Sequence, residues 1–381
     1  MTDPYLDREQ TKAKHFILRR YLQALAFKVL RFSDITYVDG FSGPWKTKTE
    51  DFIDSSFMIA INVLKDAQQI IQIQTKRRPR IRCFFSESNR QAYTQLTAAV
   101  RSLHKPDDFE IKTHWGEFED AVPDIEAFID RSFPLIFIDP TGWKGYSFSK
   151  IGPLFNRPKC EVLINFMYDF VNRAASMSDV KTIASLDPIL GGKGWEARLD
   201  PSLVRGRAVE KLFRDNLASI GHFDFVVSTK IDRPTSDRPH FFVVYGTKSR
   251  EGLKAFRDTE YGALKINARD RADAKERKRE SRSGVQDLFS GVEADFQETT
   301  IDEIVEEQKA LASAETLNIL REFGPVSFSG LWEILLQAYM LRVTNVKDIC
   351  VDLADVNKIE RTWGGGNRKP SDQVLIRLKA S

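Results

Sequence analysis

The stretch of sequence that decides the fold is ITYVDGFSGP, residues 35–44. Its first four residues are β-branched or aromatic, which favours a strand. The strand stops at Asp39, and Gly40 and Gly43 just after it predict a tight turn. Glycine in such a turn lets the backbone come close to a ligand. We therefore expect the first strand of an α/β sheet here, with a ligand site beyond its end.

Three more short apolar runs and one shorter strand follow, and stretches with helical periodicity lie between them. The strands are expected at 83–85, 110–112, 135–138 and 162–164, and the helices at about 89–103, 117–131 and 147–156. Three of these strands stop at a polar or acidic residue, as the first one does. Short apolar strands that alternate with helices predict a mostly parallel sheet with helices on both faces.

An amphipathic helix is expected before the first strand, over residues 8–30. Leu18, Leu22 and Leu25 recur at intervals of four and three, which places them on one face of the helix. Lys14 falls outside that apolar face.

The second half of the sheet is expected to differ from the first. A helix is predicted over about 202–220, with Asp200 as its N-cap and Gly221 just past its end. Apolar runs at 223–227 and 241–245 then flank a loop with Pro and Asp. Two strands joined without a helix pair antiparallel, so the sheet should end in a hairpin. The predicted fold class is α/β, a Rossmann-like, mostly parallel sheet with an antiparallel terminal hairpin.

The charged residues are unevenly distributed, although 57 Lys+Arg and 54 Asp+Glu nearly cancel to a net charge of +3. Residues 266–283 are rich in Arg and Lys, and residues 287–307 carry eight acids and no base. Such a segment indicates a linker or a solvated helix. The 381 residues suggest two or three domains at about 150 residues each. We place a sheet domain at 1–265, a charged linker at 266–303 and a C-terminal domain at 304–381.

The C-terminal segment has the pattern of a winged helix. Helical stretches at about 304–322, 329–341 and 345–355 precede two apolar runs around a glycine-rich tip. The basic residues at and beside this tip are Arg361, Arg368, Lys369 and Arg377. Together with basic clusters at 76–82 and 269–282, they favour nucleic acid as a partner, bound with a steep dependence on salt.

The composition excludes several classes of protein. The hydrophobic fraction of 42% and the charged fraction of 29% are those of an ordinary globular chain. No apolar stretch approaches 18 residues, and the N-terminal residues lack the apolar core of a signal peptide. The three cysteines are far apart, which gives no zinc-site spacing and fits a reducing compartment. We expect a cytoplasmic protein with no membrane partner and no metal site.

Residues 14–22, 37–44, 137–143 and 161–173 together resemble a known family, the three-Cys-motif partner proteins. That family is similar to class I S-adenosylmethionine-dependent methyltransferases. The resemblance spans most of the predicted sheet domain, and the tail resembles the winged helix-turn-helix attached to some members. It implies a sheet whose antiparallel hairpin is the methyltransferase signature. It also implies a partner, a radical-S-adenosylmethionine protein with three cysteines.

The resemblance implies that S-adenosylmethionine binds at the carboxyl ends of the first three strands. The turn at 39–43 would contact its methionine end, Glu87 its ribose, and residues 116–118 its adenine. The implied cofactor-binding residues are Asp39, Gly40, Phe41, Ser42, Gly43, Glu87, Gly116, Glu117 and Phe118. Trp45 stands where the family pattern tends to have a second glycine, so its indole could crowd the cofactor.

The sequence DPTGW at 139–143 occupies the place of the Asp-Pro-Pro-aromatic motif of amino-methyltransferases. In that motif the Asp side chain and a backbone carbonyl hold a planar amino group, and the aromatic residue stacks on the base. The implied catalytic residues are therefore Asp139, Pro140 and Trp143. Such chemistry depends on orienting the amine lone pair, and a base in a duplex would have to be flipped out. Alternatively, Trp143 and Asn165 only pack at the ends of their strands.

Three functions remain open from the sequence alone. The first is a methyltransferase that modifies nucleic acid, with the amino group of a base as the favoured acceptor. The second is a nucleic-acid-binding adaptor with little or no catalytic activity, which works with the radical-S-adenosylmethionine partner. The third is a Mg²⁺-dependent nuclease that uses Asp39, Glu87 and Asp139 as oxygen ligands.

Overall fold

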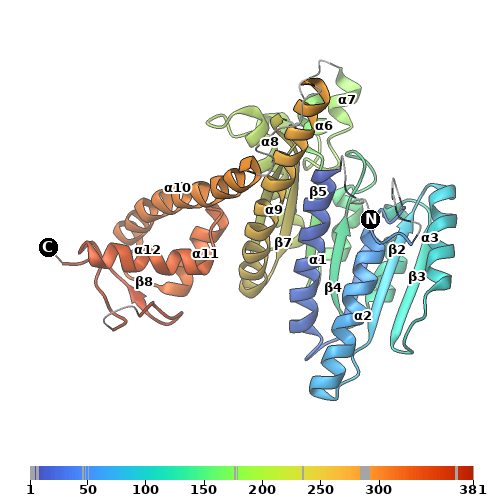
Figure 1. The fold of residues 1–381 in the computed structure, drawn as a ribbon, viewed down its shortest axis with the longest axis horizontal. Helices are drawn as coiled ribbons and strands as arrows, with labels where there is room; N and C mark the ends of the chain where they lie inside the picture. Colours follow the sequence, from blue (N-terminus) through green and yellow to red (C-terminus); the bar gives the residue numbers. More distant parts are fainter. Residues whose placement is uncertain are drawn as a thin grey trace. The chain divides into compact units, whose positions relative to one another are not determined.

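The protein divides into two compact units, Met1–Gly252 and Leu253–Ser381. A computed structural model (Figure 1) describes residues 5, 8–44, 47, 49, 51–175, 177, 179–233, 236–283, 292–364 and 368–380. The sequence placed the end of the first domain at residue 265 and a linker at 266–303. In the structure, the described residues of 266–303 lie in two helices, α9 (Arg250–Ser283) and α10 (Val292–Phe323). Ala268 and Ala272, one helical turn apart, are buried, which explains how so charged a stretch packs as a helix.

The first unit is built on a seven-stranded sheet with the strand order β3-β2-β1-β4-β5-β7-β6. The strands are β1 (Ile35–Asp39), β2 (Ile81–Glu87), β3 (Phe109–Trp115), β4 (Phe133–Ile138), β5 (Glu161–Phe166), β6 (Phe225–Arg233) and β7 (Ser236–Thr247). Neighbours among β1 to β5 pair parallel, whereas β7 pairs antiparallel with both β5 and β6. The predicted mostly parallel sheet with an antiparallel terminal hairpin is therefore confirmed.

Helices cover both faces of this sheet. They are α1 (Glu9–Val29), α2 (Ser56–Thr75), α3 (Arg90–Ser102), η1 (Phe118–Ala121), α4 (Val122–Ile129), α5 (Phe148–Phe155), α6 (Tyr168–Ala175), α7 (Val180–Ala184), η2 (Trp195–Arg198) and α8 (Arg205–Gly221). The blue helices α1 and α2 lie side by side on one face (Figure 1). Helix α8 begins at Arg205 and not near 202, because the Asp200 carboxylate closes a local turn by accepting hydrogen bonds from Ser202.

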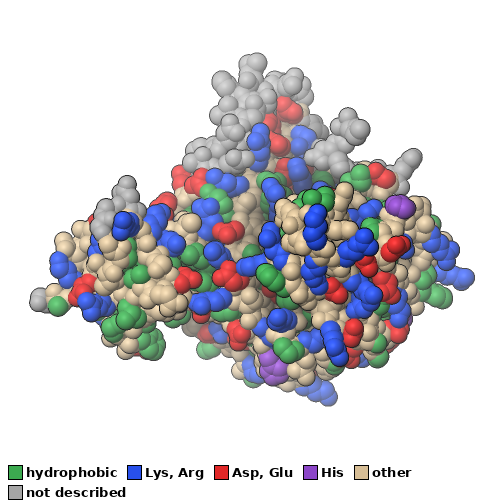
Figure 2. Space-filling model, turned by 90° about the horizontal axis from the view of Figure 1, so that it is seen from below, with side chains coloured by type: hydrophobic (Ala, Val, Ile, Leu, Met, Phe, Trp, Pro, Cys, Tyr) green, Lys and Arg blue, Asp and Glu red, His purple; other side chains and the backbone are tan. Residues whose placement is uncertain are grey.

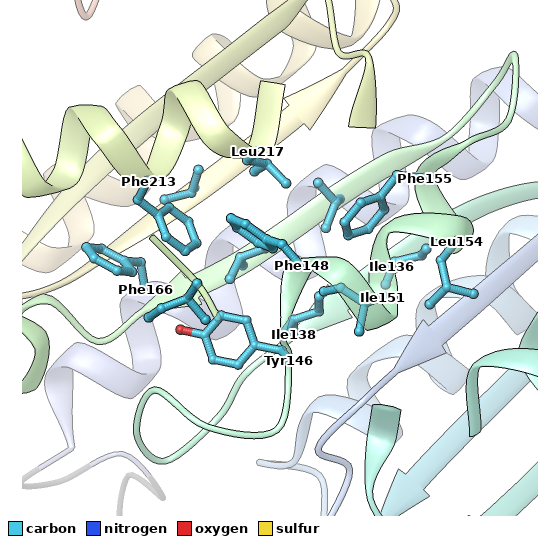
Figure 3. Close-up of a cluster of buried hydrophobic side chains, with 14 of the residues drawn as sticks. Ile136, Ile138, Tyr146, Phe148, Ile151, Leu154, Phe155, Phe166, Phe213 and Leu217 are labelled. Carbon is cyan, nitrogen blue, oxygen red and sulfur yellow. The ribbon is translucent and has the colours of Figure 1, made fainter. Parts of the chain in front are cut away.

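The main apolar cluster lies between the sheet and helices α4, α5 and α8 (Figure 3). On β5 it takes Val162, Ile164 and Phe166, and the Phe166 ring stacks on Phe213 of α8 with 4.2 Å between centroids. Successive residues of a strand point to opposite faces. Glu161 and Asn165 of β5 therefore face the α1 side of the sheet, as the polar contacts below also show.

The second unit consists of helices and a small antiparallel sheet. After α9 and α10 come β8 (Val326–Ser327), α11 (Phe328–Ala338), α12 (Val343–Asp355) and β9 (Leu375–Ile376), and β8 pairs antiparallel with β9. The helices predicted near 304–322, 329–341 and 345–355 correspond to α10, α11 and α12. Between the described residues of the two terminal apolar runs, which were expected to flank a glycine-rich tip, Ile359 and Leu378 form an antiparallel bridge.

A buried ion pair lies inside the second unit. The Arg257 guanidinium and the Glu260 carboxylate, both nearly inaccessible to solvent, are 2.5 Å apart. Arg257 also donates a hydrogen bond to the carbonyl of Leu336 in α11, over 2.8 Å. This pair therefore joins α9 to α11. Within the described ranges of the whole chain, no helix has the length and apolar character needed to cross a bilayer.

Candidate functional site

Backbone hydrogen bonds bring the strand-end turns together at one edge of the sheet. The amide of Gly40 donates to the carbonyl of Phe137 in β4, over 3.0 Å. The amide of Ser42 donates to the carbonyl of Ser86 in β2, over 2.9 Å. The turn after β1 is thus attached to the strand on each side of it, at the carboxyl edge where ligands bind in open α/β sheets.

Asp39 is fully buried and holds this turn in shape. One oxygen of its carboxylate accepts a hydrogen bond from the amide of Phe41 (3.0 Å), and the other accepts one from the hydroxyl of Ser56 (2.7 Å). Burial raises the pKa of Asp39 to about 7, although these hydrogen bonds oppose the shift. Both carboxylate oxygens are therefore bound within the chain, where they hold the turn to the start of α2.

Gly40 has no room for a side chain, because the ring of Phe118 lies directly against it. A Cβ on Gly40 would approach three ring atoms of Phe118 to between 2.8 and 3.0 Å. The resemblance implies that Phe118 borders the adenine. In the structure Phe118 is buried in the core beneath the turn, and the centre of its ring lies 6.0 Å from that of Phe41. Glu117 is exposed and its carboxylate lies close to Gly145, which has a positive φ of 86°.

Glu87 and Gly116 adjoin at the ends of β2 and β3. The amide of Gly116 donates to the carbonyl of Glu87 over 3.1 Å. The buried carboxylate of Glu87 accepts a hydrogen bond from the amide of Asn89, over 2.6 Å. Gly116 has a φ of 155°, and a Cβ there would lie 2.6 Å from Nε2 of His114. The turn after β1, the end of β2 and the end of β3 are therefore neighbours at this edge, as the sequence predicted.

Asp139, just beyond β4, is bound on both carboxylate oxygens. Lys14 Nζ lies 2.6 Å from Oδ2, and Nδ2 of Asn165 donates to Oδ1 over 2.7 Å. The Lys14 side chain is only 12% exposed, so the expectation that it lies outside the buried face of α1 is wrong. An ion pair that replaces lost hydration explains how a lysine occupies this position.

Pro140 and Trp143 fix the loop that follows Asp139. Pro140 is buried, and the half-buried indole of Trp143 packs on the main apolar cluster. The indole N–H donates to the hydroxyl of Ser185, just past α7, over 2.9 Å. Trp143 thus has the packing role that the sequence left open. It attaches the loop to the main apolar cluster and to the end of α7.

The predicted nucleic-acid-binding residues lie in the second unit, and three of the four are paired with acids. The pairs are Arg361 with Asp355, Lys369 with Asp348, and Arg377 with Glu360. Arg368 is exposed. On the face shown in Figure 2, blue and red side chains are interspersed. Surface pairs of this kind contribute little to stability.

Two members of the basic cluster at 76–82 have structural roles. The Arg77 guanidinium donates to the Asp34 carboxylate over 2.9 Å and to two backbone carbonyls after α1. The side chain of Arg82 is 13% exposed and lies 3.7 Å from the Glu110 carboxylate. Neither guanidinium is an unpaired surface cation.

The described residues contain no group of three or more His, Cys, Asp or Glu side chains arranged to hold a metal ion. Asp39, Glu87 and Asp139 therefore do not form the oxygen-ligand set that a Mg²⁺-dependent nuclease would need. The three cysteines are buried and not in disulfides. Trp45 lies outside the described residues.

The sequence did not identify Lys14, Ser56 or Asn165 as parts of this site. A usable signal for Lys14 is its spacing of seven from Tyr21, two helical turns, since both residues contact polar side chains of the sheet. For Asn165 the signal is strand alternation, because it shares a face with Glu161.

No known family model matches the chain, and a search of curated proteins finds no match.

Proposed function

We propose that the first unit is a class I S-adenosylmethionine-dependent methyltransferase. The observation that carries this proposal is the strand order β3-β2-β1-β4-β5-β7-β6, with β7 antiparallel to its neighbours. The antiparallel terminal hairpin is the signature of that class. The turns after β1, β2 and β3 also meet at the edge where a nucleoside cofactor would lie.

The residues present fit this cofactor. The Cβ positions of Gly40 and Gly116 are filled by the rings of Phe118 and His114, so glycine at each position lets a neighbouring ring pack against the backbone of the turn. The turn at 40–43 would hold the methionine end through its backbone, and buried Glu87 would accept hydrogen bonds from the ribose. Residues 116–118 would border the adenine, with Phe118 supporting the turn from below. Asp39 acts through the turn that it stabilises.

When bound, S-adenosylmethionine would supply a methyl group carried on a positively charged sulfur. On transfer of that methyl group to the acceptor nitrogen, the C–S electron pair would stay on sulfur and the nitrogen would lose a proton to solvent. The task of the protein is then to hold the acceptor in line with that methyl group. The loop that begins at Asp139 and is fixed by Trp143 lies beside the β1 turn, since β1 and β4 are neighbours. It is the proposed place of the acceptor.

Nucleic acid is the proposed acceptor, with the amino group of a base as the target. We propose that α10, α11, α12, β8 and β9 form the winged helix that binds it, with Arg361, Arg368, Lys369 and Arg377 as phosphate contacts. Because three of these residues are paired with acids, phosphates must displace carboxylates. Each phosphate that such a cation contacts releases counterions from the nucleic acid, so binding should weaken steeply as salt is added.

A second function is favoured by one observation. Lys14 and Asn165 each bind one oxygen of the Asp139 carboxylate, so the group that would hold a target amine is already paired with two side chains of the chain itself. An adaptor that binds nucleic acid, and serves a radical-S-adenosylmethionine partner without transferring methyl groups itself, would tolerate this arrangement.

Calorimetry on the full chain with S-adenosylmethionine tests the first function. We expect micromolar binding that Glu87→Gln weakens by about tenfold, a change of about 1.4 kcal/mol. The matched control is Glu110→Gln, in which an exposed acid of β3 is changed in the same way. If the wild-type chain gives no heat with the cofactor, the methyltransferase proposal is refuted. Salt-sensitive binding of an oligonucleotide by the same protein would then support the adaptor.

A further inference from the structure

The side-chain amide of Asn165 is oriented by its neighbour. Nδ2 donates to Oδ1 of Asp139 over 2.7 Å, and a carboxylate that is paired with a lysine can only accept hydrogen bonds. The amide therefore cannot be flipped, and its oxygen must point away from Asp139. Asn165 is 4% exposed, and among the described residues this oxygen has no hydrogen-bond partner.

An unpartnered acceptor in so buried a position is unusual, because removal from water without a new hydrogen bond is unfavourable. The position of this oxygen in the fold suggests a function for it. Ile138 and Ile164 are paired in register, so the residues that follow them, Asp139 and Asn165, lie side by side at the carboxyl edge. This is the same edge at which the turns of the candidate site meet.

The surroundings of this acceptor are built from four elements. Lys14 comes from α1, Asp139 from the end of β4, and Asn165 from β5. Phe241 of β7 lies beside them, with Lys14 Nζ 5.9 Å from the centre of its ring. Lys14 and Asp139 are mostly buried, with side-chain exposures of 12% and 16%. The ion pair is therefore largely shielded from water, and it lies against the Asn165 amide.

We propose that Oδ1 of Asn165, and not the carboxylate of Asp139, accepts the hydrogen bond from the N–H of the methyl acceptor. This inference rests on the proposed methyltransferase function. The ligand class is a planar amino group, such as the exocyclic amine of adenine. Lys14 and Asp139 are positioning residues, which hold the amide oxygen toward the acceptor and contribute no hydrogen bond to it.

The test uses adenosine and purine riboside, which differ only in the exocyclic amino group. The full chain, saturated with S-adenosylhomocysteine, is titrated with each nucleoside while the NMR signal of the Asn165 side-chain amide is followed. We expect adenosine to shift that signal and to bind about tenfold more tightly than purine riboside. Asn165→Leu, which removes the acceptor at similar volume, should abolish the preference between the two nucleosides.

Lys14→Met gives a second variant, because Asp139 without its ion pair is held less firmly and orients the Asn165 amide less well. It should reduce the preference for adenosine, whereas Lys28→Met, at an exposed ion pair of the same helix, should not. Unchanged binding of S-adenosylhomocysteine by the variants shows that they are folded.

The inference is overturned if the wild-type chain binds neither nucleoside or binds both equally. It is also overturned if Asn165→Leu keeps the preference. Failure of the methyltransferase proposal is seen separately, as a wild-type chain that does not bind the cofactor.

Discussion

Replacing Gly40 with alanine tests the close packing beneath the turn of the candidate site. The added Cβ would lie between 2.8 and 3.0 Å from three ring atoms of Phe118, closer than such atoms approach in folded proteins. Gly40 is not among the glycines with positive φ, so the cost comes from packing alone. Phe118 is 1% exposed and belongs to the main apolar cluster, so its ring has little freedom to move.

The size of the effect follows from two opposing terms. Overpacking a core costs about 1–3 kcal/mol, and the reduced freedom of the unfolded chain with alanine returns about 0.4–1 kcal/mol. We expect a net loss of about 1–2 kcal/mol in the free energy of unfolding. For a unit of this size, that loss lowers the melting temperature by about 2–8 °C. Urea and thermal unfolding followed by circular dichroism measure both quantities.

The matched control is Gly142→Ala, in the loop after β4. A Cβ at Gly142 would have no atom within 4 Å, so its effect should be within about 0.5 kcal/mol. Phe118→Leu removes the ring that the new methyl group would meet. In the double variant the two changes should therefore cost less than their sum. If Gly40→Ala is as stable as Gly142→Ala, or if the two changes add, the packing argument is refuted.

Two further predictions concern buried charged groups. Burial raises the pKa of Asp39 from 3.8 to about 7, so the folded protein keeps a proton that the unfolded chain loses near pH 4. The corresponding stability is present below pH 4 and is lost as pH rises toward 7, by at most about 4 kcal/mol. Asp39→Asn should flatten this slope in urea unfolding between pH 4 and 8, and an unchanged slope would contradict the assignment. In the second unit, Arg257→Leu should cost about 3–5 kcal/mol, because it leaves the Glu260 carboxylate buried without its guanidinium. The double change with Glu260→Leu should recover most of that loss in thermal unfolding; equal losses in both variants would contradict the argument.

Local pattern was sufficient to predict the sheet and its hairpin. The runs that became β1, β4 and β5 are short, apolar and followed by polar residues, and such patterns depend only on neighbours in the chain. The start of α8 was less well predicted, because Asp200 has two local options. Its carboxylate closes a turn on Ser202, and the helix begins at Arg205. Cap and turn residues are the same types, so composition does not separate these outcomes.

The sequence by itself determined the succession of strands and helices along the chain, the antiparallel hairpin, and the glycine turn at 39–43. These features follow from the periodicity and turn preferences of adjacent residues. Only the tertiary structure decided which polar groups meet. Lys14 is 125 positions from Asp139 in the chain, and Asn165 is 26 positions from it. Both side chains nevertheless bind the Asp139 carboxylate, which accepts a hydrogen bond from the Asn165 amide. Hydrogen bonds and ion pairs form between groups that are close in space, and the separations along the chain carry no record of that closeness.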